Sequence, residues 1–114
     1  MSKKTVYALF SRLNRKHKIH ISKFVLDQGA IPSFPTIVED FYNTKPLTTV
    51  ETIAERKDAI VRRADEVWVF GEISDDILDD VLLARRLGKK LRYFDGLPNM
   101  IAEVSEGDLR PSSE

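Results

Sequence analysis

The segment from Asp65 to Phe94 constrains the fold more than any other part of the chain, because it reads as strand, turn, helix and strand. A strand is predicted at Glu66–Phe70, where a run of Val, Trp, Val and Phe carries no charge after its first residue, as in strands covered on both faces. A helix is predicted at Asp75–Leu87, since Ser74 is a favourable N-cap, acidic residues occupy the first turn and Gly88 follows the last turn. This order predicts a parallel β-α-β unit.

One acidic residue lies on the apolar side of this predicted helix. With Ile77 placed at zero on a wheel of about 3.6 residues per turn, Asp80 falls at about 300°, between Ala84 and Leu87. A buried carboxylate without partners is costly or becomes protonated, so a helix that only covers a sheet would carry an apolar residue there. Either another group compensates the cost of burying the Asp80 carboxylate, or Asp80 lies at the edge of the apolar stripe and reaches solvent or an arginine.

Strands and helices alternate along the rest of the chain as well. Further strands are predicted at Thr5–Phe10, Ala30–Phe34 and Lys90–Phe94, and Pro32 restricts the second of these to a sheet edge or a strand start. The remaining predictions are a loop at Ser11–Lys16, helices at Ile19–Gln28, Thr36–Asn43 and Val50–Ala64, a short closing helix at Leu97–Val104, and a disordered polar tail at residues 105–114.

This alternation predicts the fold class. It indicates an α/β protein with a three-layer flavodoxin-like or Rossmann-like fold, in which helices cover both faces of a mostly parallel sheet of about four to five strands. The chain has 114 residues, a length typical of one domain, which we expect to span residues 1–104.

The topology also predicts where a ligand binds. In sheets of this kind ligands lie beyond the carboxyl ends of the strands. Asp80 lies nearly two turns into its helix and its side chain leans toward the helix N-terminus, so we expect it to reach the same crevice. The other residues expected to line this site are Phe10, Ser11, Arg12, Phe34, Gly71, Glu72, Ser74 and Asp76.

Composition excludes several classes of function. The chain has 18 Lys and Arg against 18 Asp and Glu, so no net charge attracts it to nucleic acid or to an anionic membrane. The basic run Arg12–Lys18 is either a solvated surface or an anion-binding patch. No apolar stretch approaches the roughly 20 residues that span a bilayer, and Met1–Lys4 is not a signal peptide. We therefore expect a soluble, cytoplasmic protein that acts on a small molecule.

Known catalytic motifs are also missing. There is no cysteine and only two histidines, which argues against thiolate chemistry and zinc sites. Neither a P-loop nor a GxGxxG fingerprint is present, and the strand at Glu66–Phe70 is not followed by an acidic phosphoacceptor. Acidic residues around the start of the Asp75–Leu87 helix suit Mg²⁺ by type, but they point in different directions, so we predict no metal and no cofactor.

The stretch ADEVWVFGEISDDILDDVLLARRLGKKLRYF, together with HISKFVLDQGAIPSFP, resembles the nucleoside 2-deoxyribosyltransferase-like family across Val6 to Phe94. The shared pattern is an apolar strand, a Gly, a Ser, then Gly-x-x-x-Glu with Ala four residues later, a Gly-Lys pair and another strand. In that family the Glu is the nucleophile that attacks the anomeric carbon of a deoxyribose. The matching position is Asp80, which the helical wheel singles out independently.

The resemblance implies a chemistry and a set of roles. Cleavage of an N-glycosidic bond passes through an oxocarbenium-like transition state, which a nearby carboxylate stabilises or bonds to. We expect Ser74 and the free N–H groups of the helix start to hold a phosphate or a sugar hydroxyl, and Phe10, Arg12 and Phe34 to line the base or phosphate end. A homodimer or larger homo-oligomer that completes the site is also plausible for this family.

Two positions depart from the family pattern. Asp76 replaces the glycine and brings bulk and negative charge to the helix start, and Asp80 is one methylene shorter than the family Glu. A misplacement of about 1 Å can cost on the order of 10²-fold in rate. The alternative is therefore a non-catalytic binding or interaction domain, in which Asp80 is a buried structural carboxylate paired with Arg12 or with a hydroxyl.

Overall fold

A computed structural model describes residues 3–34 and 58–105 of the protein. Its sheet has five strands in the order β2-β1-β3-β4-β5. The first four run parallel, and β5 is antiparallel to β4. The strands are β1 (Thr5–Phe10), β2 (Ile31–Ser33), β3 (Glu66–Phe70), β4 (Lys90–Asp95) and β5 (Ala102–Val104). The predicted α/β fold with a mostly parallel sheet is confirmed.

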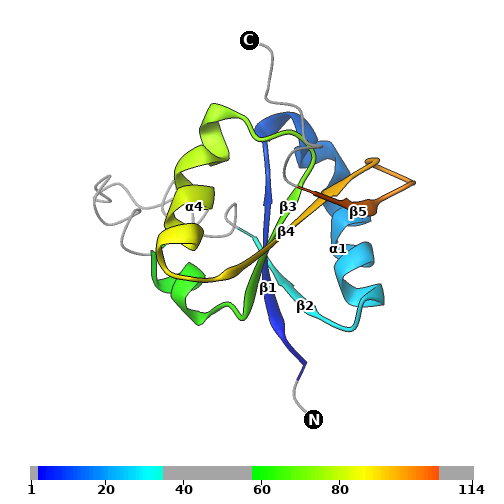
Figure 1. The fold of residues 1–114 in the computed structure, drawn as a ribbon. Coiled ribbons are helices and arrows are strands. Elements are labelled where there is room, and N and C mark those ends of the chain that lie inside the picture. The colour runs from blue at the N-terminus through cyan, green and yellow to red at the C-terminus, as the bar shows by residue number, and fades with distance from the viewer. Residues whose placement is uncertain (1–2, 35–57, 106–114) are drawn as a thin grey trace, which may run out of the picture.

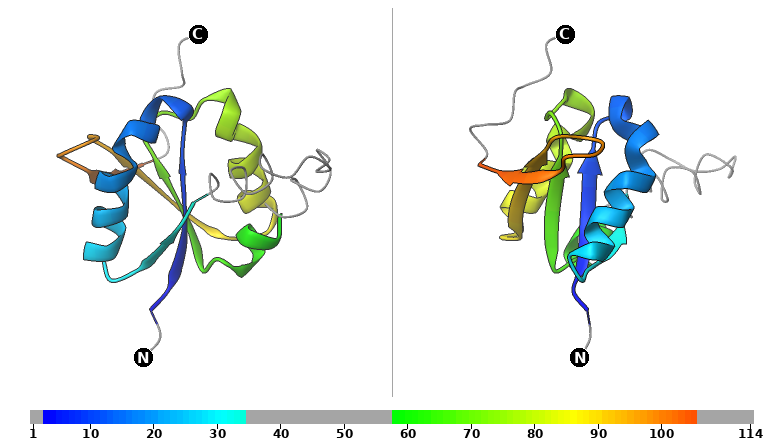
Figure 2. Two further views of the ribbon diagram at one scale, coloured as in Figure 1. Left: turned by 180° about the vertical axis from the view of Figure 1, so that it is seen from behind. Right: turned by 90° about the vertical axis from the view of Figure 1, so that its right-hand side faces the viewer.

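Helices cover the two faces of this sheet (Figure 1). Helix α1 (Lys18–Asp27) lies on one face. On the other face lie α4 (Asp75–Arg86) and a helical turn at residues 58–63. The view from behind in Figure 2 also shows the sheet between these two layers. The structure is thus the three-layer arrangement that the alternating pattern predicts, and its fold is flavodoxin-like.

Each face of the sheet has its own apolar core. On the α1 face, Ile21 and Val25 pack on alternate residues of β1, β3 and β4, which include Trp68, Phe70 and Phe94. On the α4 face, Ile77, Val81 and Ala84 pack on the residues in between, which include Leu9, Val69 and Tyr93. All five residues of β3 are buried. The uncharged run that predicted a doubly covered strand therefore lies at the centre of the sheet.

The short strand β2 lies at the sheet edge, as its proline requires. Pro32 is opposite Val6 in the parallel pairing with β1, and β2 pairs on its other side with none of the strands that the structure describes. The helix before it ends where Gly29 adopts a φ of 80°. Glycine adopts this backbone conformation at little cost, and so it commonly ends helices.

The predicted loop at Ser11–Lys16 is wrong, because residues Arg12–His17 form a 3₁₀ helix, η1, that runs directly into α1. Its first turn closes through a hydrogen bond of 2.9 Å from the Asn14 N–H to the Ser11 carbonyl. None of its residues is buried. A 3₁₀ turn that buries nothing leaves no apolar periodicity in the sequence, so the pattern could not reveal it.

The predicted closing helix at Leu97–Val104 is also wrong. The chain turns after β4 and returns as β5, which pairs antiparallel with Tyr93, Phe94 and Asp95. Gly96, with a φ of 92°, makes this turn, and its N–H donates to the Asp95 carboxylate at 2.8 Å. The Arg92 guanidinium then bonds both oxygens of Glu103 at 2.7 and 2.9 Å. The pairing with β4 and this contact both join residues on opposite sides of the turn, and a local helical pattern contains neither.

Some predicted elements lie outside the described residues. They are the helix at Thr36–Asn43, most of the helix at Val50–Ala64, and the tail beyond residue 105. Within the two described ranges, no helix is both long enough and apolar enough to traverse a lipid bilayer.

Candidate functional site

The side on which the chain adds new strands to the sheet changes between β1 and β3. From β1 the chain moves outward to β2, and it then returns to the opposite side of β1 to form β3. Loops that leave two such neighbouring strands diverge to opposite faces, and this opens a crevice beyond their carboxyl ends where ligands bind in doubly wound sheets. In Figures 1 and 2, η1 and the first turn of α4 lie side by side at this end of the sheet.

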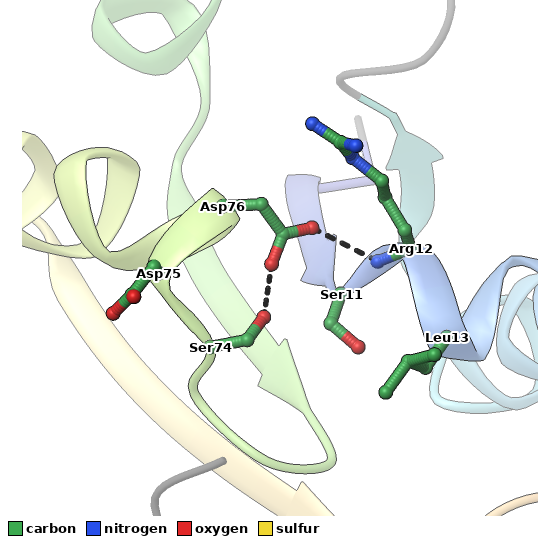
Figure 3. A pocket seen from close by; sticks show the side chains of 6 residues that line it. All are labelled: Ser11, Arg12, Leu13, Ser74, Asp75 and Asp76. Carbon is green, nitrogen blue, oxygen red and sulfur yellow. Dashed lines mark hydrogen bonds between the residues drawn. The ribbon is translucent and has the colours of Figure 1, made fainter. Parts of the chain in front are cut away.

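A cavity of about 460 Å³ lies at this crevice. Among the described residues, its lining comes from the start of η1 and the start of α4 (Figure 3): Ser11, Arg12, Leu13, Ser74, Asp75 and Asp76. Four of these residues are predicted from the sequence to line the site, and the other two, Leu13 and Asp75, are not. Leu13 belongs to the unpredicted η1, whereas Asp75 is the next residue after Ser74 and could have been included.

Asp76 joins the two sides of the cavity. One of its carboxylate oxygens accepts a hydrogen bond of 2.9 Å from the backbone N–H of Arg12, and the other accepts one from the hydroxyl of Ser74. Partial burial raises the pKa of Asp76, but these hydrogen bonds outweigh burial and lower its pKa below the ordinary value of 3.8. Asp76 is therefore ionised at neutral pH.

Ser74 occupies the N-cap position of α4, as predicted, but its hydroxyl bonds the Asp76 side chain rather than a backbone N–H of the helix. Ser11 is only 1% exposed, and its hydroxyl makes no hydrogen bond within the described part of the chain. Of the two carboxylates that line the cavity, that of Asp76 accepts hydrogen bonds from protein donors, and the buried Ser11 hydroxyl has no partner among the described residues.

Asp80 lies one helical turn beyond Asp76 on the same side of α4, and it is only 8% exposed. Residues four apart on a helix have Cβ atoms about 5–6 Å apart. Asp80 does not line the cavity within the described residues, but its Cα–Cβ bond tilts toward the helix N-terminus and hence toward Asp76. The prediction that Asp80 belongs to the buried side of this helix is confirmed.

The predicted aromatic residues lie on the other face of the sheet. Phe10 and Phe34 are both buried in the α1-face core, where their rings meet edge to face with centroids 5.7 Å apart. The Lys18 ammonium lies 5.2 Å from the centre of the Phe34 ring. Neither phenylalanine lines the cavity at the start of α4.

Gly71 and Glu72 line a second cavity of about 300 Å³ beyond the ends of β3 and β4. Its other described lining residues are Asn14, His17, Asp95, Gly96 and Leu97. Gly71 has a φ of 79°, and a Cβ added there would lie 2.6 Å from Nδ2 of the Asn14 side chain. The structure therefore divides the predicted site residues among two cavities, the α1-face core and, for Asp80, the buried side of α4. Across the described ranges, no three His, Cys, Asp or Glu side chains are placed to hold a metal ion.

Comparison with known proteins gives a likeness at the level of fold. No protein-family model matches this chain, and no curated protein matches its sequence. Among solved structures, it is similar to the 2-desoxiribosyltransferase from Leishmania mexicana, with a TM-score of 0.57 over 91% of this chain and 80% of that chain. The sequence identity is 14%, and at this level the likeness shows a shared fold alone.

Proposed function

We propose that the protein binds a nucleoside or nucleotide at the carboxyl end of the sheet, and that Asp80 cleaves its N-glycosidic bond or transfers its deoxyribosyl group. The observation that carries this proposal is the position of Asp80, a nearly buried carboxylate one turn below a cavity at the topological switch point. Parallel α/β sheets bind their ligands at this point. The shared fold with a 2-desoxiribosyltransferase supports the same class of substrate.

The reaction follows from the chemistry of a carboxylate beside a sugar. An oxygen of Asp80 attacks the anomeric carbon, the bond from this carbon to the base nitrogen breaks, and the base leaves with the bonding electrons and takes a proton from water. The resulting glycosyl ester of Asp80 is opened by water, which gives hydrolysis, or by the nitrogen of a second base, which gives transfer. Either route restores the carboxylate.

A chromatographic assay for free base tests this proposal. Deoxynucleosides and their 5′-monophosphates are incubated with the wild type, Asp80→Asn, and the matched control Asp79→Asn, which removes the same charge at an exposed neighbour. We expect release by the wild type and by Asp79→Asn, and a loss of at least about 10³-fold in Asp80→Asn, since the nucleophile is gone.

Thermal melting of the same three proteins separates a catalytic Asp80 from a structural one. The isosteric change to Asn should remove turnover and leave the melting temperature close to that of the wild type. No base release from any substrate, with the wild type folded, would exclude catalysis. Base release by Asp80→Asn at the wild-type rate would assign the chemistry to another residue.

A second candidate function is ligand binding without turnover. It is favoured by Asp76, which stands where the related pattern has glycine and already bonds Arg12 and Ser74 across the cavity. Titration calorimetry with the same nucleosides distinguishes this function, because it predicts saturable binding with no free base. Sedimentation in the same buffer tests for the homodimer or larger homo-oligomer that the family resemblance implies.

A further inference from the structure

Asp95 is the only aspartate in this chain that glycine follows. Each of the other aspartates precedes a residue with a side chain, and no asparagine precedes a glycine. The backbone nitrogen of the residue after an aspartate can attack the aspartyl carboxyl group and close a five-membered succinimide ring. A side chain on the attacking residue hinders this approach, whereas glycine permits it. The Asp95–Gly96 pair is therefore the sequence in this chain that is most open to the reaction.

The structure places the two reacting groups of this pair together at the end of β4. The Gly96 nitrogen lies 2.8 Å from an oxygen of the Asp95 carboxylate, to which its N–H donates a hydrogen bond. Groups that are already held close react faster, because less freedom of motion is lost on the way to the transition state. Both residues are exposed, so water, which must later open the ring, has access to them.

The turn between β4 and β5 requires glycine at position 96. The φ of Gly96 is 92°, a conformation that residues with a side chain adopt only with strain. A Cβ added to Gly96 would also overlap the carbonyl oxygen of Met100. A hydrogen bond of 2.8 Å from the Met100 N–H to the Gly96 carbonyl closes the same turn. The fold therefore retains the residue that makes Asp95 reactive.

We propose that Asp95 is a modification site at which the main chain isomerises to isoaspartate. The Gly96 nitrogen bonds to Cγ of the protonated Asp95 carboxyl group, and the hydroxyl of that group leaves as water with the proton of the N–H. Water then adds to the Asp95 backbone carbonyl carbon, the bond from this carbon to the Gly96 nitrogen breaks, and the nitrogen takes a proton. The main chain afterwards runs through Cγ, and the former backbone carbonyl becomes a free carboxylate. The reaction releases one water molecule, takes up another, and is independent of the proposed nucleoside chemistry.

The product adds one carbon to the main chain where β4 ends and the turn to β5 begins. The chain becomes longer by about 1.5 Å at Asp95, which pairs with Ala102 in the antiparallel register. Because β5 has only three residues, few strand contacts oppose a change of register. Asp95 and Gly96 also line the second cavity, together with Gly71 and Glu72. We therefore expect isomerisation to loosen β5 and to change the shape of this cavity.

Incubation of the folded full chain at physiological temperature and neutral pH over several weeks tests this proposal. Proteolysis, chromatographic separation of the peptide isomers and electron-transfer fragmentation measure the isoaspartate at each aspartate. In the folded wild type, we expect isoaspartate at position 95 to accumulate at least about 10-fold faster than at any other aspartate that the structure describes.

Two variants separate the reaction at Asp95 from general ageing of the protein. Asp95→Glu keeps the charge but moves the carboxyl group one methylene farther away, so the ring would need six members and closes slowly. This variant should show no isomerisation at position 95 above that of the other acidic residues. Asp79→Glu is the same change at an exposed aspartate of α4, and it should leave the accumulation at Asp95 unchanged.

The wild type unfolded in urea is the reference for an unrestrained Asp-Gly pair. The folded chain should isomerise at Asp95 no more than about 10-fold more slowly than the unfolded chain, because the exposed turn holds the reacting groups together. A larger difference would show that the fold protects Asp95, and it would overturn the proposal. No isoaspartate at position 95 of the folded wild type, or equal amounts in the wild type and Asp95→Glu, would also overturn it.

Amide hydrogen exchange in the aged sample tests the expected effect on β5. The aspartyl and isoaspartyl forms of a peptide that contains both Asp95 and β5 elute separately, so their deuterium contents are compared within one sample. The β5 amides should exchange at least about 5-fold faster in the isoaspartyl form, since its strand pairing is weakened. Equal exchange in the two forms would contradict the loosening of β5.

Discussion

Gly71 joins β3 to the turn before α4, and its lack of a side chain matters for the shape of the second cavity. Its φ is 79°, and a Cβ added to it would lie 2.6 Å from Nδ2 of the Asn14 side chain. Gly88 provides a matched comparison, because its φ is 72° but no atom lies within 4 Å of an added Cβ. The two glycines share a backbone conformation and differ in their surroundings.

Gly71→Ala should therefore destabilise the protein more than Gly88→Ala does. Both changes place an alanine in the left-handed region, at a cost of about 1–2 kcal/mol. At Gly71 the Asn14 side chain must also leave its position, which adds about 1 kcal/mol. Urea denaturation measures both free energies of unfolding. In the double variant Gly71→Ala with Asn14→Ala, the extra cost should disappear, and equal costs for the two single variants would contradict the reported contact.

The residue scale also shows why the site could be predicted only in part. The helical wheel placed Asp80 beside the apolar stripe of α4 but left open whether it reaches solvent, and the structure shows that it is buried. The contact from Asp76 to the Arg12 N–H joins residues 64 apart in sequence, and no local pattern contains it. The same holds for the unpartnered Ser11 hydroxyl, which becomes visible only once its neighbours are placed.

At the scale of elements, Phe24 attaches helix α1 to the sheet. Its ring meets those of Trp68, Phe70 and Phe94 at steep angles, with centroids 6.4, 6.0 and 5.2 Å away. Edge-to-face aromatic pairs add stability beyond the area that they bury. One side chain thus makes ring contacts with both β3 and β4.

Phe24→Ala should lower the free energy of unfolding by about 2 kcal/mol, since it removes a partly buried side chain that packs against three rings. Leu26→Ala is the matched control on the same helix, because Leu26 is 53% exposed, and its replacement should cost no more than about 0.5 kcal/mol. Urea denaturation followed by tryptophan fluorescence measures both, with Trp68 as the reporter at the contact. Equal costs would contradict the docking of α1 through Phe24.

The elements differ in how well the sequence predicts them, and the difference follows from whether their signals lie within one stretch of sequence. The unit of β3, α4 and β4 has its apolar periodicity, N-cap serine and terminal glycine within one continuous stretch. By contrast, β5 has three residues, and its contacts are with β4, through strand pairing and the ion pair between Arg92 and Glu103. In η1 no residue is buried. Elements that depend on partners distant in sequence leave little local signal.

At the scale of the whole molecule, three carboxyl groups connect segments that are distant in sequence, and all three have a lowered pKa. Burial alone raises the pKa of Glu66, but hydrogen bonds from the Lys4 ammonium at 2.5 Å and from the Trp68 indole at 2.9 Å outweigh it. The Arg92 guanidinium lowers the pKa of Glu103, and Ser74 and Arg12 together lower that of Asp76 against the effect of burial. These contacts join the residue before β1 to β3, the start of η1 to α4, and β4 to β5.

Acid should therefore destabilise the fold as a whole. A carboxyl group whose pKa is lower in the folded state binds fewer protons there than in the unfolded chain, so its stabilisation is complete above the ordinary values of 4.5 for Glu and 3.8 for Asp and disappears as the pH falls through the lower folded-state values. We expect a loss of about 2 kcal/mol between pH 7 and about pH 3, mainly from the buried Glu66, because solvent screens the exposed pair of Glu103.

Urea denaturation across this pH range, with Glu66→Gln and Glu103→Gln as a pair, measures this dependence. Glu66→Gln should be less stable than the wild type at pH 7 and should approach it in acid, because protonation removes the same charge from the wild type. Glu103→Gln should change the slope less, since both members of its ion pair contact solvent. If Glu66→Gln and the wild type lost stability in parallel as the pH fell, protonation of Glu66 would not cause the loss of stability. The acid sensitivity would then originate at another carboxyl group.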